Sequence, residues 1–480
     1  MKRLFCLALT AALALTLTAC GEPAADTPAP EPVQTPAAAT AEAAPAGNFY
    51  TIGHEQNYAV KEGFNTGDSW YFLDHHHLGY ALVMKIDYTT ATRRVLCNLP
   101  GCSHDSDACP AWMPGSGQDV QLFTVGDTVY AYHGVPTMNY QGSWEEYYAE
   151  VVAPKLDQPP ETMADLTREQ ILGYYRNRYA EVSAPAGVYV IQGGGDSRKN
   201  IPASQDLRNV MVGWCDGTAL YGYGMSEPAV SNSTGYRISL ADGSVTTFPL
   251  QQQEQILGAQ GDRLLTSHTV TEVPLPDYNT EGWDTYRAVL QTATVEYDWL
   301  EPDTGARTKV LELPHDDSTL GNNNFYGLCG GQLYFEDRRA QQEGNSQDRS
   351  FCTYDPATGQ WQDLLRPLPD QSMLMAGVTV AGLPDIDGQQ GQYLWITGSD
   401  NVNGQNLAWM LDTQSGELFP IQQIMAGDVF PDWAVICLAQ TDDGRFLLQT
   451  GEDEQGSSYA LLDAEAYLQG STDYTPVTNG

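Results

Sequence analysis

Hydrophobic residues occur in this chain as short runs that follow turns containing glycine or aspartate. Each run is about five residues long and rich in aromatic or β-branched residues, a composition that favours β-strands. Seven copies of this pattern begin at Gly67, Gly126, Asp216, Gly261, Gly330, Gly391 and Asp443. Recurrence at this spacing predicts a repeat architecture built from strands.

A second pattern lies between these copies and consists of two strand-like runs on either side of a polar turn that ends near glycine. Its copies begin at Lys85, Ile238, Trp299, Thr353 and Met410, with a weaker one at Leu461. Aspartate side chains accept hydrogen bonds from backbone amides in tight turns, so we expect Asp87, Asp355 and Asp412 to shape their turns.

The two patterns together describe a unit of four short antiparallel strands, which is typical of a propeller blade. A single four-stranded sheet exposes both faces, and stacking blades around an axis buries them. The sequence therefore predicts an all-β fold that is one β-propeller of seven blades, with six or eight blades as the alternatives. Residues 48–60 are a candidate strand for closing the last blade.

A helical insertion explains the spacing of 90 residues between Gly126 and Asp216. Ser143 with Glu146, and Thr167 with Gln170, fit the capping box that begins a helix. An apolar stripe at near-helical spacing follows in Ile171, Leu172, Tyr175, Tyr179 and Val182. We expect an insertion at about residues 139–185 that forms a lid, a partner surface or a decoration of its own blade. The aromatic residues of the partner surface would be Tyr140, Trp144, Tyr147 and Tyr148.

The N-terminal residues have the features of a bacterial lipoprotein signal peptide. Lys2 and Arg3 precede an apolar run that is shorter than the roughly 20 residues needed to span a bilayer. The run ends in LTACG, which matches a lipobox and predicts that Cys20 carries the lipid. The alternative is an ordinary secreted protein in which Cys20 has no such role.

The predicted organisation is a signal peptide at 1–19, the lipidated Cys20 with an Ala/Pro-rich tether at 20–47, and the propeller with its helical insertion at 48–477. A tether of this composition cannot bury enough apolar surface to fold. We therefore expect the protein on the extracytoplasmic face of the cell membrane, held in the bilayer through Cys20.

The charge of the chain excludes one class of partner. The sequence has 61 acidic and 23 basic residues and a formal net charge of −38. Such a surface repels nucleic acid, so we expect no nucleic-acid partner. The 27 tyrosines and 10 tryptophans are too many for a disordered chain and fit a β-rich fold.

Three cysteines and a histidine lie close together in the segment VLCNLPGCSHDSDACPAW. Cys97, Cys102, His104 and Cys109 supply four ligands, the number that a structural zinc site needs. The alternatives are a disulfide between two of the cysteines, since such bonds persist outside the cytoplasm, and unlinked thiols. The remaining cysteines, Cys215, Cys329, Cys352 and Cys437, lie in strand-like runs and are expected to be buried.

The run Asp74–His77 gives a second candidate for metal binding. Alternate residues of a strand point to the same side, so His75 and His77 could converge on a weakly held metal. The alternative is a solvent-exposed loop at a blade edge. The sequence contains no nucleophile elbow, zinc-protease, P-loop or dinucleotide motif.

The lipobox, the Ala/Pro tether, the YDxxTG-type strand repeats and the cysteine segment resemble β-propeller lipoproteins of Gram-positive anaerobic gut bacteria. More distantly, the chain is similar to lipoprotein-receptor-type and TolB-like propeller repeats. The resemblance implies an anaerobic habitat, in which thiol oxidation is scarcer, and this shifts some weight from a disulfide toward metal binding by the cysteines. It implies no particular activity.

Two functions fit these features. The first is a lipid-anchored propeller that binds or scaffolds a protein or glycan partner. The second is a carbohydrate-active hydrolase or lyase with an active site in the central funnel, whose carboxylates would come together only in the fold. A convergent group of carboxylates or histidines at the mouth of the channel would favour the enzyme.

Overall fold

The computed structural model of this chain describes residues 48–52, 63–75, 79–115, 120–135, 140–163, 166–204, 207–208, 210–224, 232–315, 325–337, 350–365, 379–384, 390–400, 405–427, 433–453 and 456–480. The described residues fall into two compact units. Gly142–Tyr175 form one, and the remainder form the other. None of the helices in these ranges is both long and apolar enough to cross a bilayer.

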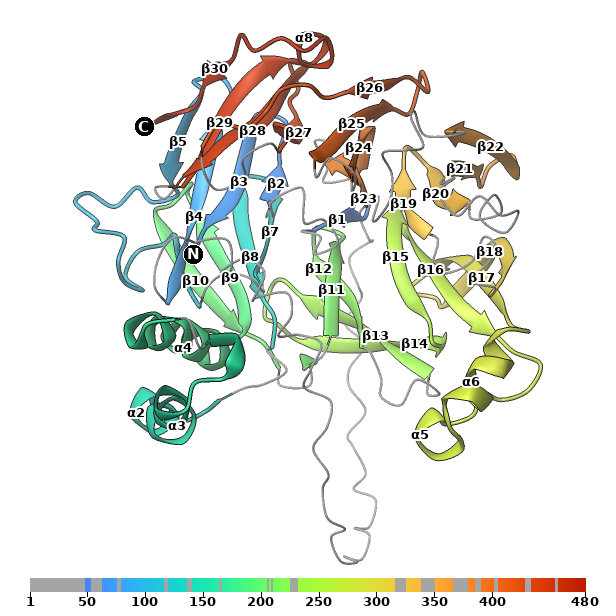
Figure 1. Cartoon of the computed structure of the whole chain (residues 1–480). Coiled ribbons are helices and arrows are strands. Elements are labelled where there is room, and N and C mark those ends of the chain that lie inside the picture. The colour runs from blue at the N-terminus through green and yellow to red at the C-terminus, as the bar shows by residue number, and fades with distance from the viewer. Residues whose placement is uncertain are drawn as a thin grey trace, which may run out of the picture. The chain divides into compact units, whose positions relative to one another are not determined.

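Seven antiparallel sheets form the larger unit, and they are arranged around a common axis (Figure 1). The fold is therefore a seven-bladed β-propeller, as the repeat predicted. Blade 1 contains β2 (Gly63–Asn65), β3 (Ser69–Asp74), β4 (Tyr80–Asp87) and β5 (Thr92–Val95), with β6 (Trp112–Pro114) paired to β4. Blade 2 contains β7 (Val120–Val125), β8 (Thr128–His133), β9 (Gly187–Gln192) and β10 (Ser197–Pro202). Blade 3 contains β11 (Val210–Cys215), β12 (Ala219–Gly224), β13 (Asn232–Ser239) and β14 (Val245–Gln252).

The other four blades have the same strand order. Blade 4 contains β15 (Gln255–Gln260), β16 (Arg263–Val270), β17 (Thr294–Glu301) and β18 (Ala306–Pro314). Blade 5 contains β19 (Phe325–Cys329), β20 (Gln332–Asp337), β21 (Ser350–Asp355) and β22 (Gln360–Leu365). Blade 6 contains β23 (Thr379–Pro384), β24 (Gln390–Asp400), β25 (Gln405–Asp412) and β26 (Leu418–Pro420). Blade 7 contains β27 (Ile436–Gln440), β28 (Arg445–Asp453), β29 (Gly456–Asp463) and β30 (Thr475–Pro476).

Six of the seven predicted Gly/Asp turns join the first and second strands of a blade. The seventh prediction is wrong, because Gly391 lies inside β24 and the connection before it is outside the described residues. The turns between third and fourth strands follow the second pattern. Asp87, Asp355 and Asp412 accept backbone amide hydrogen bonds there at 2.8–2.9 Å, as expected. The weak copy at Leu461 is not a hairpin, because α8 (Ala464–Leu468) begins at the capping residue Asp463.

The first described strand lies at the centre of the ring. β1 (Tyr50–Thr51) pairs with β11, the first strand of blade 3 (Figure 1). Phe49 donates its amide hydrogen to the Gly261 carbonyl at 2.6 Å and packs its ring against Tyr221. The prediction that residues 48–60 close the last blade is therefore wrong for residues 48–52, and residues 53–62 lie outside the described residues. A two-residue strand has no periodicity, so only these tertiary contacts fix its partner.

C-terminal residues close the ring between blades 7 and 1. β31 (Thr478–Asn479) pairs in parallel with β5 at the outer edge of blade 1. Farther inside, the Asn65 side chain donates to the Gln440 carbonyl at 2.6 Å, and Arg445 donates to the Tyr88 carbonyl at 2.9 Å. An apolar core that includes Trp70, Phe446 and Trp395 joins blades 1, 7 and 6. Burial of this surface stabilises the closed ring.

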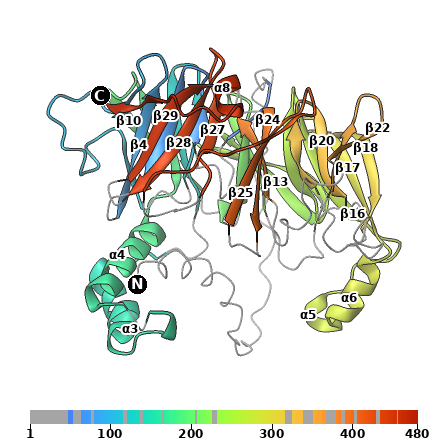
Figure 2. The ribbon, with the colours of Figure 1, turned by 45° about the horizontal axis from the view of Figure 1, so that its top comes forward.

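Helices interrupt two blades between their second and third strands. In blade 2 they are α2 (Trp144–Tyr147), a π-helical turn (Tyr148–Val152), α3 (Ala153–Asp157), a 3-10 turn (Glu161–Met163) and α4 (Arg168–Ser183). Both capping boxes are present, since Ser143 and Glu146, and Thr167 and Gln170, exchange hydrogen bonds with each other's backbone amides. In blade 4 they are α5 (Tyr278–Glu281) and α6 (Trp283–Leu290), which appear at the end of the yellow blade in Figure 2 and which the sequence analysis missed.

Candidate metal centre and polar groove

The cysteine-rich loop runs from the end of β5 to β6 and is held against blade 2. Asn98 donates its side-chain amide to the Gly193 carbonyl and to Asp196, at 3.1 and 3.0 Å. From β10, Arg198 donates to the carbonyls of Asp107 and Trp112. These contacts place the loop across the junction of blades 1 and 2.

The four predicted ligands converge in this loop. One ligand atom from each of Cys97, Cys102, His104 and Cys109 lies within 4.8 Å of the others. In a tetrahedral site with zinc–sulfur bonds of about 2.3 Å, ligand sulfurs are about 3.8 Å apart, so the sulfurs would have to approach one another by at most about 1 Å. The described residues therefore include a Cys/His cluster of the composition that binds a metal.

Backbone conformation and hydrogen bonding bring His104 into the cluster. Its φ angle is 60°, in the left-handed region that non-glycine residues adopt uncommonly. This conformation places Nδ1 at 3.3 Å from the Cys109 sulfur. Unusual backbone angles of this kind occur often at ligand sites.

The two cysteines on either side of His104 differ in their acidity. A hydrogen bond from the His104 backbone amide lowers the pKa of the Cys102 thiol. Burial raises the pKa of the Cys109 thiol to about 12. A bound cation would reverse the second effect, because metal coordination favours the thiolate over the thiol.

The remaining described cysteines have no such surroundings. Cys215, Cys329, Cys352 and Cys437 are buried among apolar residues of the blades, as expected. Of the other predicted site residues, His75 is exposed at the end of β3, whereas His77 and Cys20 lie outside the described residues.

The aromatic residues of the predicted partner surface fall in different environments. In the helical unit, the Trp144 ring lies 6.1 Å from that of Tyr147 and 6.0 Å from that of Tyr148. Tyr147 is buried, while Trp144 and Tyr148 are partly exposed. Tyr140, in the propeller unit, is partly exposed and packs against Tyr179.

Blade 4 contains a second cluster that the sequence analysis missed. His268 of β16 lies 3.7 Å from Glu296 and 3.5 Å from Asp298 of β17. Burial raises the pKa of Asp298. Lys309 pairs with Glu296 at 2.7 Å, so the cluster already contains its own cation. Because β16 and β17 are the second and third strands, this cluster is not at the first strands around the channel. Cross-strand pairing alone brings His268, Glu296 and Asp298 together, so no local sequence motif could have predicted this cluster.

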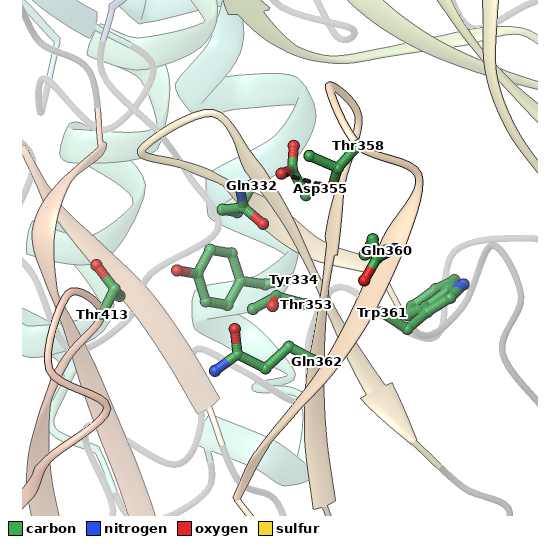
Figure 3. A pocket seen from close by; sticks show the side chains of 9 residues that line it. All are labelled: Gln332, Tyr334, Thr353, Asp355, Thr358, Gln360, Trp361, Gln362 and Thr413. Atoms are coloured by element: carbon green, nitrogen blue, oxygen red, sulfur yellow. Dashed lines mark hydrogen bonds between the residues drawn. The ribbon is translucent and has the colours of Figure 1, made fainter.

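A polar groove lies between blades 5 and 6 and has a cavity volume of about 650 Å³. Small-molecule sites commonly measure about 300–1,000 Å³. Blade 5 supplies most of the lining and the turn after β25 supplies Thr413 (Figure 3). The lining residues are Gln332, Tyr334, Thr353, Asp355, Thr358, Gln360, Trp361, Gln362 and Thr413.

Comparisons with known proteins identify no family for this chain. No protein-family model matches the chain, and no curated protein matches it. Among solved structures, it is similar to the propeller domain of the Trilobed protease from Pyrococcus furiosus, with 10% identity over 90% of this chain and 98% of that one and a TM-score of 0.43. It is also similar to Pyrococcus horikoshii acylaminoacyl peptidase, with 11% identity over 89% of this chain and 54% of that one and a TM-score of 0.44. A third similar structure is the GH74 xyloglucanase from Xanthomonas campestris, with 12% identity over 90% and 55% of the two chains and a TM-score of 0.36.

Proposed function

We propose that this chain is a lipid-anchored, extracytoplasmic β-propeller that acts as a binding module, with a structural zinc ion at the junction of its first two blades. The observation that carries the proposal is the convergence of Cys97, Cys102, His104 and Cys109. Three sulfurs and one imidazole nitrogen form a ligand set characteristic of closed structural zinc sites. All four protein ligands would be used, leaving no open position for a catalytic water.

The position of the loop explains what a bound ion would contribute. The loop is 16 residues from Leu96 to Ala111 and contains no strand or helix. Such a segment depends on cross-links or tertiary contacts for its conformation. A zinc ion would fix the loop that carries Asn98, and with it the contact between blade 1 and the outer hairpin of blade 2.

Metal analysis together with thiol counting tests this proposal. The chain, purified under reducing conditions without chelator, should contain one zinc per molecule, and the cluster thiols should react with a thiol reagent only after chelation. Cys109→Ser should reduce zinc content at least fivefold. Cys352→Ser removes a buried cysteine of blade 5 and should retain one zinc. Metal-free protein with a disulfide between two cluster cysteines would overturn the zinc assignment.

The fold also supports a proposal for which end of the ring faces the membrane and which end binds the partner. Phe49 follows the predicted tether by two residues and is hydrogen-bonded to Gly261, in the turn between β15 and β16. The predicted tether would therefore join the propeller at the end where these turns lie. In an antiparallel blade, the connections between second and third strands lie at the opposite end. The two helical insertions start there, after β8 and β16. A lipid on Cys20 would leave that end of the propeller unit accessible, and we assign partner binding to it, with Tyr140 contributing an aromatic contact. Trp144 and Tyr148 of the helical unit are separate candidates for the same role.

The location of the described His/carboxylate cluster favours a binding function over a hydrolase or lyase reaction in the funnel. His268, Glu296 and Asp298 lie within blade 4, with Lys309 beside Glu296. At the centre of the ring, β1 pairs with β11, the innermost of the four blade 3 strands. Assay of the purified protein with a polysaccharide panel checks this, and turnover by the wild-type chain would restore the enzyme alternative.

A further inference from the structure

Blade 5 departs from the usual composition of a propeller blade. Its strands present Leu333, Phe335, Cys352 and Tyr354 to the apolar core shared with blade 4. The alternate positions point to the opposite face, toward blade 6, because successive strand residues alternate. A blade within a closed ring has neighbours on both faces, so both are expected to be apolar.

The face toward blade 6 is polar instead. Cross-strand pairing aligns Tyr334, Thr353 and Gln362 in one row across the blade. A second row, one turn of the pleat away, contains Asp355 and Gln360, with Gln332 on the neighbouring strand. Figure 3 shows these side chains projecting into the groove, while the indole of Trp361 points away from it. Packing between blades does not require two adjacent rows of amides and hydroxyls. We therefore treat these rows as a candidate binding surface.

Several of these groups are held in place. Asp355 accepts hydrogen bonds from the Thr358 hydroxyl and the Ala357 amide, both at 2.8 Å. The Thr413 hydroxyl donates to the Gln392 carbonyl at 2.6 Å, which orients the side of the groove formed by blade 6. Tyr334 is only 4% exposed and forms the inner end. The amides of Gln360 and Gln362 are on exposed residues and can reach a ligand.

The chemistry of the lining selects the class of ligand. Side-chain amides both donate and accept hydrogen bonds, and hydroxyls do the same, which matches the hydroxyl groups of a sugar. Among the lining residues Asp355 is the one charged group, and there is no lysine or arginine. An anionic ligand would find no counter-charge in the groove and would face a chain of net charge −38.

We infer that the groove between blades 5 and 6 is a binding site for a neutral oligosaccharide, recognised through Gln332, Gln362 and Thr413. This inference rests on the proposed binding function and adds a sugar site whose residues differ from Tyr140, Trp144 and Tyr148. It places the sugar between two neighbouring blades, against the second, third and fourth strands of blade 5.

Calorimetric titration of the full chain with defined tetrasaccharides tests the inference. The probes are β-1,4-linked tetramers of glucose, xylose, mannose and galactose, with the β-1,4-linked tetramer of glucuronic acid as the acidic counterpart. At least one neutral tetramer should bind, and the acidic one should bind at least tenfold more weakly. The inference fails if no neutral tetramer binds or if the acidic one binds more tightly.

Variants locate the site. Gln332→Ala with Gln362→Ala should weaken binding by about tenfold, because two hydrogen bonds to the sugar are lost. Gln422→Ala, an exposed glutamine in the loop after blade 6, is the matched control and should bind normally. Gln362→Glu changes one exposed side chain without altering packing and should also weaken binding. Equal affinity in all variants would overturn the assignment. Loss of binding in a Trp144→Ala variant with normal groove variants would instead support the helical surface as the sugar site.

Discussion

Gly195 packs closely against the cysteine loop and thereby positions one ligand of the candidate metal centre. Gly195 has a φ angle of 119°, and a Cβ atom there would lie 2.8 Å from the Cys97 amide nitrogen and 2.7 Å from the Leu96 carbonyl oxygen. A side chain at this position would therefore push the first ligand away from the cluster.

Gly195→Ala is expected to lower zinc affinity at least tenfold and to lower the thermal unfolding midpoint. The physical reason is the backbone overlap with Cys97 together with the cost of positive φ. Competition with a fluorescent zinc chelator measures the affinity. Gly126→Ala is the control, because Gly126 also has positive φ (55°) but open space around it. Equal zinc affinity in both variants would show that Gly195 does not position the ligand.

The ion pair between Asp443 and Arg445 lies beside the closure of the ring and makes stability depend on pH. Hydrogen bonds from Arg445 lower the pKa of Asp443 to about 2. The same guanidinium donates to the Tyr88 carbonyl of blade 1. An aspartate in an unfolded chain has a pKa of about 3.9, so ionised Asp443 stabilises the fold above that pH. The stabilisation is lost as the pH falls from about 4 to about 2.

Asp443→Asn should therefore be less stable than the wild type at pH 7, with the difference disappearing near pH 2. Urea unfolding at pH 7, 4 and 2 measures this. Because Asp443 is more than half exposed, solvent screening keeps the effect small. Asp473→Asn, which removes the same charge from an exposed loop, is the control. A difference between wild type and Asp443→Asn that stays constant down to pH 2 would contradict the account.

At the scale of elements, the last three residues join the two ends of the propeller. The amide hydrogen of Thr478 bonds to the Ala91 carbonyl at 3.0 Å, that of Gly480 bonds to the Arg93 carbonyl at 2.9 Å, and the Arg93 side chain donates to Asn479 at 2.7 Å. These bonds cross from blade 7 to blade 1 and are formed only in the closed ring.

A chain that ends at Val477 should keep its β-rich circular dichroism spectrum but unfold at a lower temperature, by a few degrees. Three lost hydrogen bonds at about 1 kcal/mol each give the scale of the effect. Asn479→Ala removes the side-chain bond alone and should show a smaller decrease. An unchanged unfolding temperature in the truncated chain would mean that the apolar core closes the ring unaided.

The sequence predicted the strand hairpins wherever a turn pattern repeated. It gave no signal for pairings between residues that are far apart in the chain. Glycine and aspartate at fixed positions identified the first hairpin of six blades, and the seven copies gave the blade number although the one at Gly391 does not mark a turn. The helix at Ala464–Leu468 replaced a hairpin because Asp463 caps it, a choice that the Asp/Gly pattern does not distinguish. The partner of β1 is set by the contact of Phe49 with Tyr221, 172 positions away, which no local pattern records.

The candidate sites follow the same division. Cys97, Cys102, His104 and Cys109 are local in sequence and could be found from spacing. The polar rows of blade 5 could not, because Tyr334 and Gln362 become neighbours only through two cross-strand pairings. An alternation of polar and apolar residues in β20–β22 is visible in the sequence, but an edge strand facing solvent would show it equally.

For the whole molecule, the proposed lipid on Cys20 determines where the propeller acts. Expressed in a bacterium with lipoprotein processing, the wild-type chain should sediment with membranes and incorporate labelled palmitate. Cys20→Ala should be released or remain unprocessed and take up no label. Cys6→Ser, which changes a cysteine within the apolar run of the signal, is the control and should behave as wild type. Labelling of the Cys20→Ala chain would contradict lipidation at this residue.

The central claim is that the cysteine-rich loop holds a zinc ion, which stabilises the junction of blades 1 and 2 in a propeller that acts as a binding module. X-ray absorption at the zinc edge tests it most directly on the purified full chain. The account predicts one zinc per molecule, with three sulfur ligands at about 2.3 Å and one nitrogen ligand at about 2.0 Å. A zinc shell of oxygen and nitrogen without sulfur, or protein that is folded and free of metal, would contradict it.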